Sequence, residues 1–193
     1  MPERTSSSPV SDAYAGSVTV RRVLATDSER IRMLRLEALG DPAAGIAFLE
    51  TREHAAGRPP EFWIDRAVGG ALSDTSAQFI AEVGRSWVGT VTVLVPASGG
   101  ADYFARPADA QRALAVAVYV SPSQRGRGVV DALFDAAADW ATDRGCVELA
   151  LDVHEDNLRA QAAYMRIGFR PTGVTVESPN GTEQVMVMGL GRG

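Results

Sequence analysis

The chain has 193 residues, a formal net charge of −5 at pH 7 and a hydrophobic fraction of 46%, which suits a single domain with one core. The net negative charge argues against a nucleic-acid partner, because proteins that grip phosphate backbones present a basic face. The longest apolar run, residues 113–120, is far shorter than the roughly 20 residues of a membrane-spanning helix, so no membrane partner is expected.

The first 16 residues are polar and rich in serine, without the hydrophobic segment of a secretory signal. They are expected to form a disordered tail (1–16) ahead of a single domain (17–193). The one cysteine, Cys146, cannot pair within the chain and suits a reducing compartment, so a cytoplasmic location is expected. His54 and His154 lie far apart and lack the spacing of a metal site, so no metal is expected.

A strand and a helix are the first elements expected along the chain. Residues 17–24 are rich in valine and alternate in part, as strands do. Thr26 and Glu29 have the spacing of a capping box, in which side chains and backbone amides satisfy one another at a helix start. Apolar residues follow at helical spacing as far as Gly40, which predicts the end of this helix.

The next elements are a short helix and a hairpin. A second helix is expected over residues 62–67, after a pair of prolines. Strands at 78–83 and 87–95 are close enough in sequence to form a hairpin. The connection at 96–112 has no clear period, and loops of that length in a compact domain often carry function.

The second half has the clearer periodicity. Residues 113–120 are apolar at every position, which is typical of a strand covered on both faces. The pattern then predicts a helix over 129–144, a strand over 147–153, a helix over 157–167 and strands over 174–177 and 184–190. This order indicates an α/β fold (α+β mixed) with one mixed sheet and helices on both faces.

The strongest local signal is the segment SPSQRGRG between a predicted strand and a predicted helix. Gly126 and Gly128 let backbone amides point inward, and a helix N-terminus attracts negative charge. Arg125 and Arg127 add positive charge, so the loop predicts a diphosphate site; the alternative is a structural turn with two solvated arginines. No Walker A loop is present, and Asp131 replaces the last glycine of a dinucleotide fingerprint.

The segment VYVSPSQRGRGVVDALFDAA resembles the acetyl-CoA motif of GNAT acetyltransferases, [QR]xxGx[GA]. Arg125 matches its first position and Gly128 its fourth, whereas Val130 replaces the usual glycine or alanine at the sixth. A valine there would narrow the cradle or displace one amide. The resemblance implies that backbone amides of this loop bind the coenzyme pyrophosphate, at Arg125, Gly126, Arg127, Gly128, Val129 and Val130.

A second segment, LDVHEDNLRAQAAYMRIGF, is similar to the later pattern of the same family. It matches at Asn157, Ala160, Tyr164, Gly168 and Phe169, and the first three share one face of a helix. By itself this pattern also fits a core stripe that ends at a glycine cap. The two motifs occur in the family's order, and specific motifs are confined to about residues 113–170.

The resemblance implies a GNAT fold with a mostly antiparallel sheet of about six or seven strands, splayed at the cofactor cleft. Acetyl-CoA would be the donor, its pantetheine arm paired with backbone at Val118, Tyr119 and Val120 as an added strand. A primary amine would attack directly, without a covalent enzyme intermediate. Asn157, Ala160 and Tyr164 would contact the coenzyme. Tyr164 is the expected donor of a proton to the departing thiolate, or else it only packs on the pantetheine.

A general base is harder to assign, because strand 113–120 lacks the glutamate that many relatives carry there. Either the amine arrives already deprotonated, or a nearby group accepts the proton. The candidates for that group are Glu82, Asp102, Tyr103, Asp152 and His154.

The stretch RLEALGDPAAGIAFLETREH followed by FW resembles the region that sets acceptor specificity in the family. It predicts Phe48, Glu53 and Trp63 as acceptor-site residues. Asp102, in the connection at 96–112, is a further candidate, and either Glu53 or Asp102 is expected to pair with an ammonium group. A buried aromatic anchor explains Phe48 and Trp63 equally well.

Two further readings stay open at this stage. A degenerate family member would bind CoA as a sensor or scaffold without turnover, and a longer acyl-CoA would satisfy the same loop. The acceptor could be a small molecule or a peptide amine, and a homodimer is possible.

Overall fold

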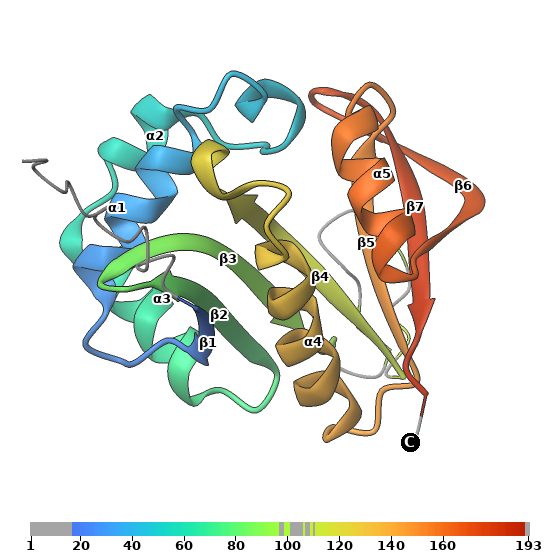
Figure 1. The fold of residues 1–193 in the computed structure, drawn as a ribbon, viewed down its shortest axis with the longest axis horizontal. Coiled ribbons are helices and arrows are strands. Elements are labelled where there is room, and N and C mark those ends of the chain that lie inside the picture. Colours follow the sequence, from blue (N-terminus) through green and yellow to red (C-terminus); the bar gives the residue numbers. More distant parts are fainter. Residues whose placement is uncertain (1–16, 97–98, 101–105, 107–108, 110, 192–193) are drawn as a thin grey trace, which may run out of the picture.

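The computed structural model describes residues 17–96, 99–100, 106, 109 and 111–191. Within them one seven-stranded sheet is flanked by helices (Figure 1). The elements in chain order are β1 (Val18–Arg22), α1 (Ser28–Ala38), η1 (Ala44–Ile46), α2 (Arg52–Ala56), α3 (Pro60–Leu72), β2 (Ser76–Val83), β3 (Ser86–Leu94), β4 (Arg112–Val120), η2 (Pro122–Gln124), α4 (Val129–Thr142), β5 (Glu148–His154), α5 (Leu158–Ile167), β6 (Arg170–Ser178) and β7 (Gly181–Gly189).

The sheet has the strand order β1-β2-β3-β4-β5-β7-β6. Every neighbouring pair is antiparallel except β4 and β5, which run parallel. The predicted fold class, a mostly antiparallel mixed sheet with helices on both faces, is therefore confirmed. The helices η1, η2 and α2 were not predicted, because each is too short to show a periodic pattern.

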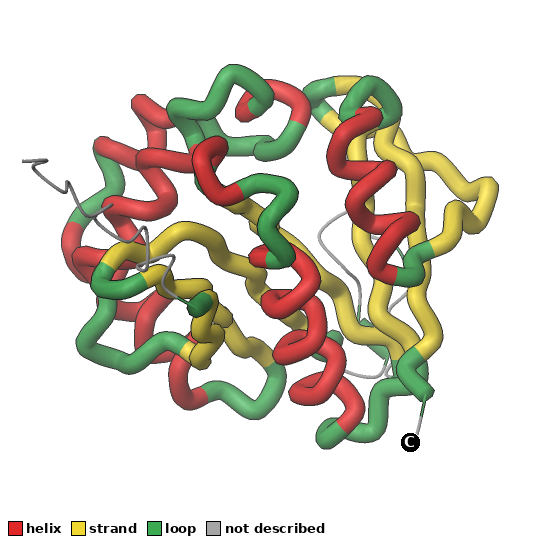
Figure 2. The backbone as a smooth tube through the Cα atoms, viewed as in Figure 1, coloured by secondary structure: helices red, strands yellow, loops and turns green. Residues whose placement is uncertain are grey.

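The parallel pair β4 and β5 is joined over a short stretch only. Arg112, Ala113 and Leu114 pair with Glu148, Leu149 and Ala150, and no later pairing between the two strands occurs. Figures 1 and 2 show the strands close together at that end and apart at the other. The predicted splaying is therefore present, and it leaves one edge of β4 without a strand partner beyond Leu114.

A bulge in β4 lies at the start of this free edge. Val116 pairs with Thr92 and Tyr119 with Thr90, so two residues of β4 stand opposite the single residue Val91. Ala117 has φ 54°, in the left-handed region that non-glycine residues rarely adopt. The extra residue reverses the alternation of side chains, so Tyr119 faces the side opposite Ala115.

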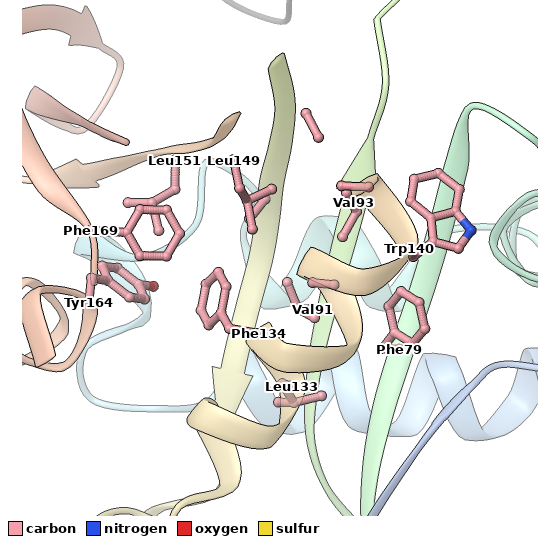
Figure 3. Packing of buried hydrophobic residues seen from close by; sticks show 14 of the residues in the cluster. Phe79, Val91, Val93, Leu133, Phe134, Trp140, Leu149, Leu151, Tyr164 and Phe169 are labelled. Carbon is pink, nitrogen blue, oxygen red and sulfur yellow. The ribbon is translucent and has the colours of Figure 1, made fainter. Parts of the chain in front are cut away.

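Helices cover both faces of the sheet and bury two apolar clusters. Residues of α1 and α3, among them Ile31 and Trp63, pack on one face, and α4 and α5 pack on the other. In the second cluster Phe134 makes edge-on contacts with Tyr164 and Phe169, at ring-centroid distances of 5.7 and 5.1 Å (Figure 3). These contacts fix α5 against α4 along the side of the gap between β4 and β5.

The start of α1 differs from the sequence prediction. Asp27, rather than Thr26, occupies the N-cap position, and no side chain caps the helix. The Asp27 carboxylate instead accepts hydrogen bonds from the Leu24 amide and the Arg21 guanidinium, both at 2.8 Å. The predicted capping box is therefore wrong, because a tertiary contact with β1 takes the place of the local one.

None of the helices in the described residues combines the length and apolar character needed to cross a bilayer. The predicted tail, residues 1–16, lies outside the described part of the chain.

Candidate active site

A cavity of about 730 Å³ occupies the gap between the parted strands. Its walls come from the free edge of β4, the end of β5, one side of α5 along most of its length and the segment that joins α1 to α2. One end reaches the glycine loop at the start of α4, and the other reaches Phe48 and Glu50. The cavity therefore connects the predicted coenzyme loop with the predicted acceptor region.

The glycine loop has the backbone shape expected of an anion cradle. Gly126 and Gly128 have φ of 72° and 79°, and a Cβ built at either would meet no atom within 4 Å. The amides from Gly126 to Val130 donate to no acceptor in the described part of the chain. Unpaired amides at the N-terminus of a helix attract anions through both hydrogen bonding and the helix dipole.

Arg125 does not supply free positive charge to this loop. Its guanidinium is ion-paired with Asp41, whose side chain is 4% exposed, and its Nε donates to the Val120 carbonyl oxygen at 3.0 Å. Arg125 thereby ties the loop to β4 and to the segment after α1. Arg127 is exposed and forms no ion pair among the described residues, so any countercharge from the motif's two arginines comes from Arg127.

The Asp41 carboxylate should make stability depend on pH. Burial alone would raise its pKa, but hydrogen bonds from the Ala43 amide and from Arg125 hold the pKa below its ordinary value. A carboxyl group whose pKa is lower in the folded than in the unfolded state stabilises the fold at pH values above its unfolded-state pKa. This contribution is lost as pH falls through the folded-state pKa.

The substitution Asp41→Asn is therefore expected to lower Tm by about 3–10 °C at pH 7, since a hydrogen bond to a charged group is lost. The difference from wild type should shrink as pH falls below about 4, where the unfolded aspartate is protonated. Thermal melts across pH 3–7 would check this. A Tm difference that is independent of pH would contradict the assigned role.

The predicted pantetheine strand lies on the cavity wall. Val118, Tyr119 and Val120 all contribute to its lining. The Tyr119 hydroxyl donates to Glu37 Oε1 at 3.0 Å, and burial together with Glu37 raises the pKa of Tyr119 to about 12. Tyr119 is therefore a neutral anchor between β4 and α1, and it pairs with Thr90 of β3.

The three predicted residues of α5 also line the cavity. Asn157 is the N-cap, and its Oδ1 accepts a hydrogen bond from the Ala160 amide at 3.3 Å. Tyr164 is 9% exposed and packs between Phe134 and Phe169. Burial raises the pKa of Tyr164, so its phenol is protonated at neutral pH.

Two of the candidate bases, Asp152 and His154, lie on β5 and interact with other protein groups. Asp152 lines the cavity but forms a two-point ion pair with Arg106, at 2.8 and 2.7 Å. His154 has both ring nitrogens engaged, since Nε2 lies 2.9 Å from the Asn180 carbonyl oxygen and Nδ1 accepts from the Asp156 amide at 3.1 Å. Both side chains are thus already engaged in interactions within the protein. 

The remaining candidate bases are Glu82, Asp102 and Tyr103. Glu82 accepts from Trp87 Nε1 at 2.6 Å and is not among the cavity-lining residues. Asp102 and Tyr103 lie outside the described residues. In the described part of the chain, no group of three or more His, Cys, Asp or Glu side chains is placed to hold a metal ion.

Of the predicted acceptor residues that the structure describes, Phe48 alone lines the cavity. Trp63 is 2% exposed in the core beneath α1 and α3, and Glu53 is an exposed residue of α2. Trp63 is thus a buried aromatic anchor, which was the alternative to its prediction as an acceptor-site residue. The Arg35 guanidinium lies over the Phe48 ring, 4.6 Å from its centroid, and pairs with Glu50.

Three acidic residues of the cavity wall were not predicted: Asp41, described above, Glu50 and Glu183. Glu50 is ion-paired with Arg35 and Arg58. Glu183 lies on β7, outside both motifs and just before the strand predicted over 184–190, so no sequence signal marked it.

With this geometry established, the chain can be placed by comparison with known proteins. The profile of the Acetyltransferase (GNAT) family matches residues 34–169, and the chain therefore belongs to that family. The match includes the glycine loop, the free edge of β4 and the whole of α5.

Individual relatives agree with this placement. Aminoglycoside N(6')-acetyltransferase type 1 of Salmonella typhimurium (strain LT2) is 38% identical over 55 residues, which cover 28% of this chain and 38% of that protein. The PaiA N-acetyltransferase of Thermoplasma acidophilum, solved with coenzyme A, has a TM-score of 0.68 and 17% identity, covering 90% of this chain and 99% of that one. The structure of AAC(6')-Iy with a bisubstrate analogue, CoA-S-monomethyl-acetylneamine, has a TM-score of 0.62 and 23% identity, covering 83% and 95%. The two structures share the fold, and the first relative is matched over little more than a third of its length.

Proposed function

We propose that this protein transfers an acetyl group from acetyl-CoA to a primary amine, in a ternary complex. One observation carries the proposal: a single cavity joins a cradle of unpaired amides at the start of α4 to the segment around Phe48. A coenzyme bound at one end would present its thioester to an amine at the other. Such juxtaposition of two reactants supplies up to about 7–11 kcal/mol in well-oriented cases.

The coenzyme would be held mainly by backbone. The amides of residues 126–130 suit the pyrophosphate, and glycine at 126 and 128 leaves space where a Cβ would otherwise project. The edge of β4 beyond Leu114 offers amide and carbonyl groups to the pantetheine, as an added strand would use them. Ala160, a small residue on the facing side of α5, leaves room for the arm.

The bulge in β4 suits the chemistry at the thioester. Ala117 and Val118 stand outside the regular pairing with β3, so their backbone groups are not committed to that pairing. We assign the Val118 amide to the thioester carbonyl, where it would stabilise the negative charge that develops during attack. Tyr164, across the cavity on α5, would give its proton to the sulfur as the carbon–sulfur bond breaks.

The acceptor is proposed to be a primary amine on a compact, cationic or polyhydroxylated molecule. Carboxylates at Glu50, Asp152 and Glu183 line the part of the cavity remote from the glycine loop. The aminoglycoside acetyltransferases to which the chain is similar provide the first compounds to test.

A thiol-release assay tests this function. Purified protein is incubated with acetyl-CoA and, in separate reactions, neamine, spermidine, a set of amino acids and a peptide with a free N-terminus. Thiol release that depends on the amine, with a product heavier by one acetyl group, is the expected result. Binding of acetyl-CoA without any amine-dependent release would contradict the proposal and favour a sensor.

A further inference from the structure

Glu183 lies on the face of the sheet that is turned away from α4 and α5. Side chains on a strand alternate between faces. Met186 of β7 and Val153 of β5 belong to the core under those helices, and His154 pairs with Glu183 in an unbroken register. Glu183, His154 and Asp152 therefore project toward the opposite face, where Phe48 and α1 lie.

Among the carboxylates of the cavity wall, Glu183 differs in forming no ion pair with an arginine of the described residues. Asp41 is paired with Arg125, Glu50 with Arg35, and Asp152 with Arg106. In the described part of the chain, the one hydrogen bond to the Glu183 carboxylate comes from Ser178 Oγ, at 3.1 Å. A cationic ligand could therefore approach Glu183 without displacing an internal ion pair.

The turn between β6 and β7 holds Glu183 in place over the cavity. Asn180 Nδ2 donates to the Phe48 carbonyl oxygen at 2.8 Å, which links this turn to the acceptor segment. His154 Nε2 lies 2.9 Å from the Asn180 carbonyl oxygen, which links the same turn to β5. The side of the cavity that bears Glu183 is thus fixed to both β5 and the segment after η1.

We propose that Glu183 binds the ammonium group of the acceptor and takes up its proton before attack. This inference rests on the proposed function and names the group that the sequence could not assign. Glu183 and Tyr164 line one cavity from opposite sides of the sheet. The acceptor would enter from the side of the sheet that bears Glu183, and the coenzyme from the side that bears Tyr164.

The proton balance is simple. The ammonium group transfers one proton to the Glu183 carboxylate and becomes a neutral amine. Its lone pair then forms the nitrogen–carbon bond while the carbon–sulfur bond breaks, and the sulfur receives a proton from Tyr164. The nitrogen loses its second proton to water as the amide forms. Tyr164 then regains a proton from water and Glu183 gives its proton up to water, so one proton is released per turnover.

The surroundings of Glu183 favour this role. Burial is the main cause that raises the pKa of Glu183. The hydrogen bond from Ser178 and the nearby His154 oppose this effect, and Asp152 adds to it. The groups that face Glu183 are Asp152 and His154 on β5 and Ser178 on β6, with Arg106 beyond Asp152. A carboxylate with a raised pKa accepts a proton more readily than an ordinary one.

The test compares Glu183→Gln with a matched control, Glu177→Gln. Glu177 lies on the same hairpin, is exposed, and pairs in register with Thr182, so it faces the other way. For Glu183→Gln, kcat/KM of the best acceptor should fall on the order of tenfold or more, and the limb of its pH profile that reports this carboxyl group should disappear. The Kd for acetyl-CoA should stay within about twofold for both variants.

Thermal melts give a readout that is independent of turnover. A carboxyl group whose pKa is raised in the folded state lowers the free energy of unfolding when pH is above that pKa. This effect is absent at pH values below the unfolded-state pKa. Glu183→Gln should therefore raise Tm at pH 8 and have little effect at pH 4. A purely structural carboxylate would instead lower Tm when it is replaced.

The failure of this inference can be told apart from failure of the proposed function. If Glu183→Gln behaves like Glu177→Gln in kcat/KM and in Tm, the assignment of Glu183 is overturned while the function stands. If wild type shows no amine-dependent turnover, the function fails. The variants are then compared by calorimetric binding of neamine to the CoA complex, and equal heats overturn the role of Glu183 as well.

Discussion

Replacing Tyr164 with phenylalanine is expected to lower kcat by about 10²–10⁴-fold, the range typical of a lost general acid. The thiolate of CoA would then have to depart without a proton from the protein. The Tyr164 hydroxyl makes no hydrogen bond within the described residues, and its ring packs on Phe134 and Phe169. Phenylalanine retains those ring contacts, so the fold should be unaffected.

Three measurements on this variant separate catalysis from packing. Steady-state kinetics give kcat, calorimetry gives the Kd for acetyl-CoA, and a thermal melt reports folding. We expect kcat to change and the other two to stay near wild type. A kcat within about twofold of wild type would remove the acid role and leave Tyr164 as a packing residue.

The substitution Gly128→Ala is expected to weaken CoA binding by about 10–100-fold, which corresponds to one hydrogen bond to a charged group. Gly128 adopts φ 79° as the N-cap of α4, a conformation that costs an alanine about 1–2 kcal/mol. No atom lies within 4 Å of the added Cβ, so strain rather than collision opposes the substitution. Relief of that strain would turn amides of the cradle away from the pyrophosphate.

Gly145 offers a matched control for Gly128. It has the same φ of 79°, also with no atom within 4 Å of an added Cβ, but it follows the C-terminal end of α4. Gly145→Ala should reduce Tm about as much as Gly128→Ala and leave the Kd for CoA unchanged. Equal CoA affinities in the two variants would show that the loop does not bind the coenzyme through its backbone.

Much of the fold could be predicted because it depends on local patterns. The apolar period of α4 and the alternation in β5 follow from the faces that these elements bury. The glycine loop was recognisable for a similar reason. Positive φ at Gly126 and Gly128 is a property of single residues, so the sequence reveals it.

Contacts between distant segments could not be predicted in this way. Arg125 was expected to face an anion, but it pairs with Asp41, which lies 84 residues earlier. Asp27 was available as a cap for α1, and Arg21 on β1 takes its carboxylate instead. In both cases the partner of the charged side chain depends on tertiary packing. The segment after α1 packs beside the end of β4, and β1 packs beside the start of α1.

The acceptor side of the site shows the same limit. Trp63 and Phe48 are both aromatic residues in the first half, and packing alone decides that one lies in the core and the other on the cavity wall. Glu183 carries no motif. Its position at the cavity follows from the register between β7 and β5, which a single sequence does not reveal.

The most direct test of the central claim is a calorimetric titration of the wild-type protein with CoA. Unpaired amides at the start of α4, beside the free edge of β4, should bind one CoA per chain, and Gly128→Ala should weaken that binding whereas Gly145→Ala should not. A wild-type protein that takes up no CoA would contradict the account, because the cavity would then have no coenzyme to present to an amine.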